Sequence, residues 1–189
     1  MTRIVSGRAG GRRLRVPGAG TRPTSDRVRE AAFNLVAARV EFDGMRVLDL
    51  YAGSGALGLE ALSRGAAHAL FVESDRAAAS VVRENIATLG LAGAELRVGT
   101  VGSVLSAGPR VPYDVVFSDP PYALDGADVA ADLTALTVNG WLRGDALVLV
   151  ERPVRLPEID WPAPFSVSRS RRYGETRVEL AEYEPSAPG

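Results

Sequence analysis

Residues 47–58 read VLDLYAGSGALG, and this segment decides the fold. It begins with a short apolar run, typical of a buried strand, that contains one acid, Asp49. Gly53 and Gly55 then form a turn, and the leucine spacing beyond it predicts a helix over 56–64. Glycines let the backbone approach a ligand closely, and the N–H groups that begin a helix favour an anionic group. The segment therefore predicts a ligand-binding strand, loop and helix.

A second acid follows at the distance expected of a ribose-binding residue. The apolar run over 69–73 ends at Glu73, about 20 positions after Gly53. Gly53, Gly55 and Gly58 followed by Glu73 also satisfy the dinucleotide fingerprint, so an NAD-dependent oxidoreductase is the first alternative. The early acid Asp49 favours a different class, the S-adenosylmethionine-dependent methyltransferases. In that class the first acid lies near the methionine part of the cofactor and the second binds the ribose.

The turn Asp119-Pro120-Pro121-Tyr122 follows a third apolar run. Its prolines fix φ near about −65° and remove two backbone donors, so the Asp119 carboxylate and the Pro120 carbonyl can both face an amine. Tyr122 can lie against the face of a base, a contact worth about 1–3 kcal/mol in single-strand binders. A strand that ends in a surface turn is the plainer alternative. Together with the upstream motifs, the turn resembles the amino-methyltransferases, which modify exocyclic nitrogens of adenine, cytosine or guanine.

The composition fits one domain with a small appendage. With 189 residues, 46% of them apolar, the chain can bury a substantial core. No apolar stretch approaches the roughly 18 residues that cross a membrane, and no apolar signal region follows the N-terminus, so we expect a cytoplasmic protein with no membrane partner. The chain has no cysteine, and its one histidine, His68, is predicted in a solvent-facing loop. We therefore expect no metal site and no catalytic triad.

The first 30 residues carry a net charge of +6, although the whole chain carries −1. Their glycines would break the amphipathic helix of an organelle transit peptide. We expect instead a short β-ribbon, with strands over 3–6 and 12–16 around a glycine-rich turn. Clustered positive charge of this kind favours a phosphate backbone, which predicts contact with RNA. The arginines of this predicted surface are Arg3, Arg8, Arg12, Arg13 and Arg15.

The rest of the chain alternates strands and helices. Ser25 or Asp26 can cap a first helix. Strands are predicted near 46–50, 69–73, 95–98, 113–118 and 146–151, and helices near 56–64, 76–89 and 127–138. Two final alternating runs, 165–169 and 176–180, predict an antiparallel hairpin joined by 171–174.

These elements predict an α/β, Rossmann-like class I methyltransferase fold. Its sheet has seven strands, is mostly parallel and ends in the C-terminal antiparallel hairpin. The predicted division of the chain is a basic β-ribbon over 1–24, a methyltransferase domain over 25–185 and a disordered tail over 186–189. In such sheets ligands bind beyond the carboxyl ends of the strands, where Gly53, Glu73 and Asp119 all belong.

Further segments narrow the resemblance to one family. Over nearly its whole length the chain resembles the RsmD family. The segments that carry this are 4–7 (IVSG), 11–14 (GRRL), 22–30 (RPTSDRVRE), 33–34 (FN), 49–65, 119–122 and 173–176 (YGET). The resemblance implies methyl transfer from S-adenosylmethionine to the exocyclic N2 of one guanine in 16S ribosomal RNA, within the assembled small ribosomal subunit.

The resemblance also implies roles for individual residues. The implied cofactor contacts are Asp49, Gly53, Gly55 and Glu73, and the implied contacts to the target base are Asp119, Pro120 and Tyr122. Arg22 and Thr24, beside the active site, and the N-terminal arginines would meet the RNA. One position departs from the family: Val101 stands where relatives place an Asp or Asn near the adenine, so no such contact is predicted.

The base itself is only weakly indicated by the site residues. Guanine shows two adjacent donors, N1–H and N2–H, which one acceptor-only carboxylate such as Asp119 can bridge. Adenine-modifying enzymes use the same turn, so an adenine-N6 or other amino-methyltransferase acting on DNA or protein stays an alternative. A non-catalytic RNA-binding assembly factor is a further one.

Overall fold

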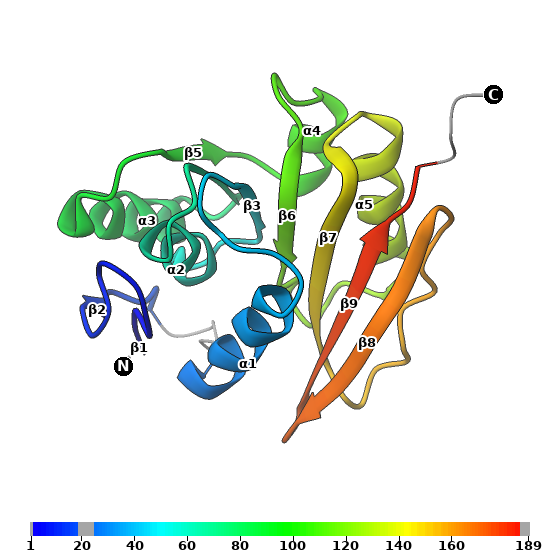
Figure 1. Ribbon diagram of the computed structural model, residues 1–189, viewed down its shortest axis with the longest axis horizontal. Helices are drawn as coiled ribbons and strands as arrows, with labels where there is room; N and C mark the ends of the chain where they lie inside the picture. Colours follow the sequence, from blue (N-terminus) through cyan, green and yellow to red (C-terminus); the bar gives the residue numbers. More distant parts are fainter. Residues whose placement is uncertain (1, 19–24, 186–189) are drawn as a thin grey trace.

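The computed structural model describes residues 2–18 and 25–185. Within them, seven strands form one sheet in the order β5-β4-β3-β6-β7-β9-β8 (Figure 1). The strands are β3 (Arg46–Leu50), β4 (His68–Glu73), β5 (Ala94–Val98), β6 (Tyr113–Ser118), β7 (Leu142–Pro153), β8 (Phe165–Tyr173) and β9 (Thr176–Tyr183). The first five pair in parallel, and β9 pairs antiparallel with both β7 and β8. The predicted sheet with its C-terminal hairpin is confirmed.

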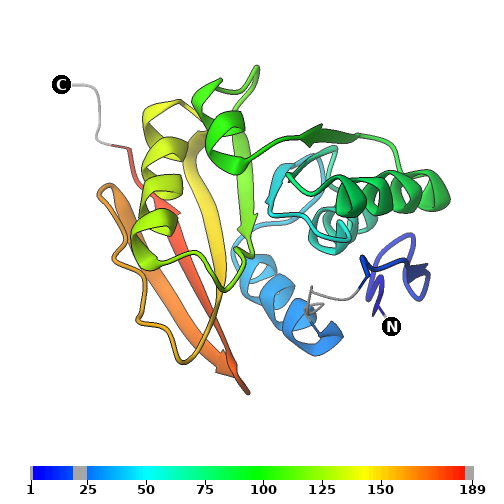
Figure 2. The ribbon, with the colours of Figure 1, turned by 180° about the vertical axis from the view of Figure 1, so that it is seen from behind.

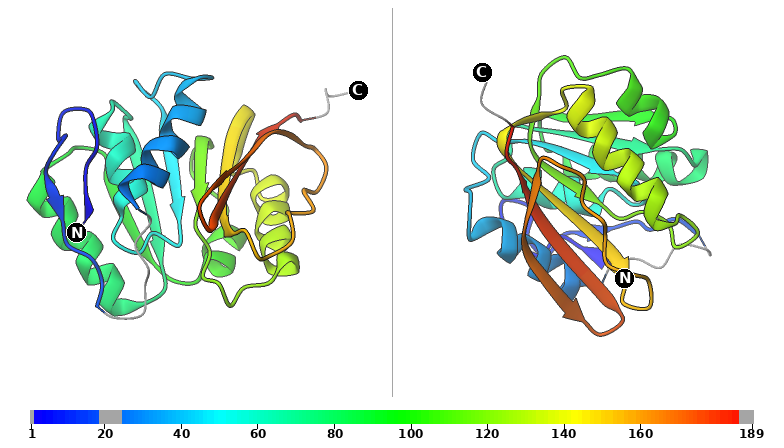
Figure 3. Two further views of the ribbon diagram at one scale, coloured as in Figure 1. Left: turned by 90° about the horizontal axis from the view of Figure 1, so that it is seen from below. Right: turned by 90° about the vertical axis from the view of Figure 1, so that its right-hand side faces the viewer.

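Helices cover both faces of this sheet. One face packs against α1 (Asp26–Ala37), α2 (Ala56–Ser63) and α3 (Arg76–Leu89), and the other against α4 (Val101–Ser106) and α5 (Gly126–Val138). Side chains alternate along each strand, so Val115 and Phe117 of β6 join the first core and Val116 joins the second. Figure 2, from behind, and Figure 3, from below, show α1 and α5 on opposite sides of the sheet.

Helix ends follow their capping residues. The Ser25 side chain, and not that of Asp26, accepts the Val28 N–H at the start of α1. The short helix α4 was not predicted, because six residues are too few for a helical period to be visible. Thr100 caps it by accepting the Ser103 N–H.

The N-terminal ribbon is shorter than predicted. Its strands are only β1 (Thr2–Arg3) and β2 (Arg13–Leu14), in place of 3–6 and 12–16. The backbone of Val5 and Ser6 bonds to a side chain of α2 instead of to a partner strand.

Two further predictions were wrong in detail. The hairpin turns at Gly174 and Glu175, so 171–173 belong to β8 and not to the turn. His68 lies at the start of β4 and not in a solvent-facing loop. Its ring is half-buried against Tyr113, with Nε2 3.3 Å from the Tyr113 hydroxyl.

Candidate active site

A cavity of about 660 Å³ lies beyond the C-terminal ends of β3, β4 and β6. Its size suits a small-molecule site. The N-terminal segment, the loop after β3 and the tip of the β8–β9 hairpin also contribute to its walls. The predicted site residues that line it are Gly53, Glu73, Asp119, Pro120 and Tyr122. Residues from three separate motifs therefore meet at one place, as the strand order requires.

The three glycines after β3 have different roles: Gly53 lines the cavity, whereas Gly55 and Gly58 do not. Gly53 has a φ of 59° and lines the cavity. Gly55, with a φ of 78°, begins α2 and is not a wall residue. A Cβ at Gly58 would lie 2.3 Å from the ring of Phe71, so α2 can approach β4 this closely only because the position is glycine. The structure thus gives Gly55 a conformational role and leaves Gly53 facing the ligand space.

Glu73 organises the loop that it faces. One carboxylate oxygen accepts the Gly53 N–H at 2.8 Å, and the other accepts the Asp75 N–H at 2.8 Å. Asp75 in turn caps α3 by accepting the Ala78 N–H at 2.7 Å. Glu73 therefore stands at the cavity wall as a fixed acceptor.

Asp49 lies behind the cavity wall. It is 1% exposed, and its Oδ2 accepts the Gly58 N–H at 2.9 Å. Within the described residues its Oδ1 has no hydrogen-bond partner. Burial raises the pKa of the Asp49 carboxyl well above its ordinary value of 3.8, and the charges of Asp119 and Glu73 add to this, against the lowering effect of the Gly58 N–H. The three acids predicted from sequence therefore lie within electrostatic reach of one another.

The Asp119–Tyr122 turn follows directly from the pairing of β6 with β3. Ser118 pairs with Leu50, so Asp119 leaves the sheet beside the loop after β3. Pro120 is buried, whereas the side chain of Tyr122 is 48% exposed. The guanidinium of Arg155 lies 5.2 Å from the centre of the Tyr122 ring. The turn is thus fixed at its base and presents an aromatic ring at its end.

Tyr51 is a cavity residue that the sequence did not reveal. It has a φ of 59°, rare for a residue with a side chain, and its hydroxyl donates to Asp132 of α5 at 2.5 Å. Burial raises the pKa of Asp132 above its ordinary value, against the lowering effect of this bond. The bond joins the loop after β3 to the helix that follows Tyr122. Only the position of Tyr51, between a strand and a glycine loop, could have drawn attention to it.

Four of the five described N-terminal arginines contact the body of the protein. Arg12 donates to the Thr88 and Leu89 carbonyls at the end of α3, at 2.5 and 3.1 Å. Arg15 pairs with Glu84 at 2.6 Å. Arg3 pairs with Asp26 at 3.2 Å, and Arg8 donates to the Leu62 carbonyl at 3.4 Å. Arg13 is exposed, and the predicted contacts of Arg22 and Thr24 lie outside the described residues.

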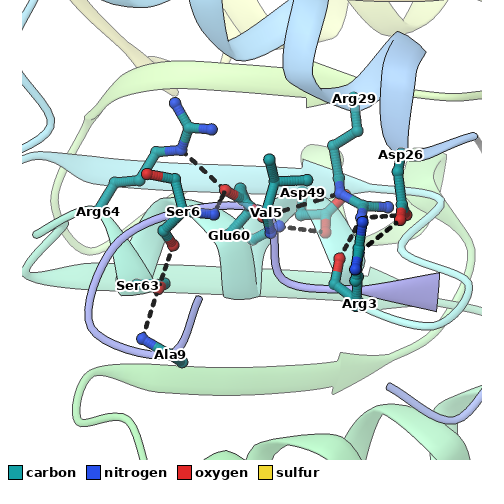
Figure 4. Close-up of polar contacts among 11 residues, drawn as sticks. Arg3, Val5, Ser6, Ala9, Asp26, Arg29, Asp49, Glu60, Ser63 and Arg64 are labelled. Carbon is teal, nitrogen blue, oxygen red and sulfur yellow. Dashed lines mark hydrogen bonds and ion pairs between the residues drawn. The ribbon is translucent and has the colours of Figure 1, made fainter. Parts of the chain in front are cut away.

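A buried carboxylate holds the N-terminal segment against α2 (Figure 4). Glu60 is 0% exposed and accepts the Val5 and Ser6 N–H groups at 2.7 and 2.9 Å. Its oxygens also lie 2.9 Å from Nε of Arg64 and 3.8 Å from Nε of Arg29. The segment that supplies one wall of the cavity is therefore anchored by charge as well as by apolar packing.

Among residues 2–18 and 25–185, no helix combines the length and apolar character needed to cross a bilayer. In the same part of the chain, no three potential metal ligands come together.

The strand order with its terminal hairpin, the glycine loop after β3 and the acid that ends β4 define a class I S-adenosylmethionine-dependent methyltransferase. Among proteins of this class, the chain belongs to the family described as Conserved hypothetical protein 95, whose sequence model matches residues 2–182. The expected likeness to the RsmD family is confirmed by named relatives. The chain is 41% identical over 185 residues to Ribosomal RNA small subunit methyltransferase D of Escherichia coli strain K12, covering 96% of this chain and 90% of that one.

Other relatives agree. The Haemophilus influenzae protein of the same name is 38% identical over 164 residues, 82% of this chain and 83% of its own. The solved structure of Escherichia coli yhhF superposes with a TM-score of 0.86 at 38% identity, covering 97% and 98% of the two chains. The 16S rRNA N2 G1207 methyltransferase of Thermus thermophilus, solved with AdoMet and guanosine, has a TM-score of 0.70 at 22% identity, over 89% of this chain and 45% of that one. That last likeness concerns the fold alone.

Proposed function

We propose that this protein transfers a methyl group from S-adenosylmethionine to the exocyclic N2 of a guanine in 16S ribosomal RNA. The observation that carries the proposal is the convergence of Gly53, Glu73 and Asp119 on one cavity. The first two belong to the cofactor motif and the third to the amine-binding turn. The Escherichia coli relative, named as a small-subunit RNA methyltransferase, supports the RNA substrate.

The residues of the cofactor half fit S-adenosylmethionine. Glu73 offers carboxylate oxygens at the wall, which suit the two hydroxyls of a ribose. Gly53 has no Cβ and leaves room for a close ligand. Asp49, with its unpartnered Oδ1, lies behind the loop, and although burial raises its pKa, a positively charged ligand nearby would favour its ionised form. S-Adenosylmethionine supplies a methyl group bound to a positively charged sulfur.

The Asp119–Tyr122 turn suits the target base. The Asp119 carboxylate and the Pro120 carbonyl are acceptors for the two hydrogens of an exocyclic amine. The exposed Tyr122 ring can stack on a base that has left its helix, which offsets the few kcal/mol that unstacking costs. Because N2 in a duplex is paired with cytosine and stacked neighbours cover both faces of the base, the target nucleotide lies in a loop or is flipped out.

Asp119 and Pro120 also activate the amine. The N2 lone pair is delocalised into the guanine ring, and hydrogen bonds to these two acceptors favour a pyramidal nitrogen whose lone pair points at the methyl carbon. The bond from N2 to carbon forms as the bond from carbon to sulfur breaks. The proton that N2 then loses passes to the Asp119 carboxylate and from there to solvent.

The cellular setting follows from the substrate. A guanine of 16S RNA within the assembled small subunit is reached in the cytoplasm, so the proposal places the protein there. It also makes small subunits, and not free RNA, the preferred substrate.

The test is transfer of labelled methyl to small subunits from a strain that lacks this protein, followed by mapping of the modified nucleotide. We expect one labelled guanine, modified at N2. Asp119→Ala should lower the rate at least about 100-fold, the minimum typical of a lost acid–base group, and leave S-adenosylmethionine binding within about twofold by calorimetry. The matched control is Asp43→Ala, an exposed acid just before the N-terminal end of β3, whereas the cavity lies beyond the C-terminal ends of the strands. Loss of cofactor binding and transfer together in Asp119→Ala would contradict the role given to Asp119.

A further inference from the structure

The outer strand β8 carries a row of arginines without a single acid. Arg169, Arg171 and Arg172 are all exposed. Within the described part of the chain, the side chains of Arg171 and Arg172 form no hydrogen bond or ion pair, and the side chain of Arg169 donates only to the neighbouring Ser168 carbonyl. These three side chains are therefore available to a partner.

Their state contrasts with that of three arginines of the N-terminal segment, whereas Arg13 of that segment is exposed as they are. Arg12 and Arg8 donate to main-chain carbonyls of α3 and α2, and Arg15 pairs with an acid. A guanidinium already held by the protein must give up or share those bonds to bind a phosphate. Arg171 and Arg172 have no such bonds to give up, so binding a phosphate costs less free energy at these two arginines than at Arg8, Arg12 or Arg15.

The row leads directly to the active site. β8 ends at Tyr173, and Tyr173, Gly174, Glu175 and Thr176 line the cavity. A fourth exposed arginine, Arg155, lies over the Tyr122 ring. The cations therefore extend from the mouth of the cavity outward along the edge of the sheet.

The two basic regions lie on different sides of the cavity. Figure 1 shows the β1–β2 sheet at one side of the lower end of β6 and the β8–β9 hairpin at the other. When an RNA strand inserts one nucleotide into the cavity between them, its phosphate backbone continues on both the 5′ and the 3′ side of that nucleotide. The span from Arg169 to Arg172 is about 10 Å at about 3.3 Å per residue, enough for more than one phosphate.

We propose that the outer edge of β8, with Arg169, Arg171 and Arg172, binds the RNA phosphate backbone on one side of the target nucleotide, and that Arg155 extends this surface to Tyr122. The inference rests on the proposed function and adds a second contact surface to it. The register supports contact from two directions, because Arg171 pairs with Val178 and Arg172 with Arg177, on opposite faces of the hairpin.

The same charges have a structural explanation. Charged side chains on an outer strand also prevent pairing with a second protein chain. That role requires no RNA, and its loss should produce self-association. Measurements of RNA binding and of oligomeric state therefore distinguish the two roles.

The experiment uses the double variant Arg171→Gln/Arg172→Gln in the full chain. The matched control is Arg110→Gln, an exposed arginine in the loop before β6, at the opposite end of that strand from Asp119. Binding to small subunits is measured as a function of KCl concentration, together with S-adenosylmethionine affinity. We expect the double variant to bind subunits about tenfold more weakly at 0.1 M KCl. Its log–log salt slope should be smaller by about 1.4–1.8, the value for two lost phosphate contacts.

Each outcome has a distinct meaning. If the wild-type protein does not methylate small subunits, the proposed function fails. If it does, and the double variant keeps the wild-type slope and affinity, the proposed β8 surface is wrong and the proposed function stands. Self-association of the variant in size exclusion, with unchanged subunit binding, would show that these arginines prevent strand pairing with a second protein chain. That result would also refute the proposed RNA contact. A flatter slope with unchanged cofactor affinity and unchanged rate at saturating subunits supports the proposal.

Discussion

Removal of the Glu60 side chain should lower the stability of the protein strongly, because Glu60 is a fully buried anion with four partners. It accepts two main-chain N–H groups from the N-terminal segment and lies against Arg64 and Arg29. Arg29 is also fully buried. Glu60→Ala removes the only side chain that satisfies the Val5 and Ser6 amides in the described structure. We expect the N-terminal segment to loosen from α2 and the whole domain to lose stability.

The size of the effect follows from the burial of the partners. Breaking a buried ion pair by removing one member costs about 3–5 kcal/mol, because the other charge stays buried. Arg29 keeps Asp26 as an ionic partner at 2.8 Å, but the Val5 and Ser6 N–H groups also lose their acceptor. For a domain of 150–250 residues each 1 kcal/mol lowers Tm by about 2–4 °C, so Glu60→Ala should lower Tm by about 6–20 °C. Domains typically unfold with about 5–15 kcal/mol, so the variant stays folded at room temperature wherever the wild-type free energy of unfolding exceeds this loss.

The assay is denaturant unfolding with a matched control. Glu84→Ala also removes an acid paired with an arginine, Arg15, but both side chains are largely exposed. That variant should lose no more than about 1 kcal/mol. Hydrogen exchange at the Val5 and Ser6 amides should speed up in Glu60→Ala and not in Glu84→Ala. Equal losses in the two variants, with both amides still protected, would refute the reasoning.

Two further perturbations test the polar contacts around the cavity. Tyr51→Phe removes a hydrogen bond to the half-buried Asp132 and should cost about 1–2 kcal/mol of unfolding free energy by denaturant titration. Because that bond lowers the pKa of Asp132, the loss should be larger at neutral than at acidic pH, and an equal loss at both would count against it. Burial raises the pKa of Asp49, so its ionised form destabilises the fold above that pKa and protonation relieves the cost as pH falls. Asp49→Asn should therefore be more stable than wild type at neutral pH, and this gain in stability should shrink on acidification. Calorimetry should also show weaker S-adenosylmethionine binding by the variant. A gain in stability that grows on acidification would contradict this.

The active-site half of the structure could be predicted because its signals are local. Gly53 follows one strand, Glu73 ends the next, and Asp119 follows another. Parallel strands place these three ends at one edge, so strand order alone brings them together. The sequence did not show that Asp49 lies behind the wall, because that depends on the Gly58 N–H being its partner.

Contacts between distant residues could not be predicted. Tyr51 meets Asp132 across 81 positions, and Arg12 meets the end of α3 across 76 and 77. The charge of the N-terminal segment was visible, but its intramolecular partners were not. For the same reason Glu60, one acid on a predicted helix, showed no sign that it binds the backbone of Val5.

Helix α2 connects the two functional halves of the molecule. At its first turn the Gly58 N–H binds Asp49, beside the cofactor motif, and two residues later Glu60 binds the N-terminal segment. Positions two apart on a helix point in different directions, so a single turn of α2 contacts both Asp49 and the N-terminal segment. Because the helix is held in close contact with Phe71 by the absence of a side chain at Gly58, neither attachment can shift without the other. The position of the N-terminal wall relative to the cofactor motif is therefore set by the packing of α2 on β4, and not by the short β1–β2 pairing.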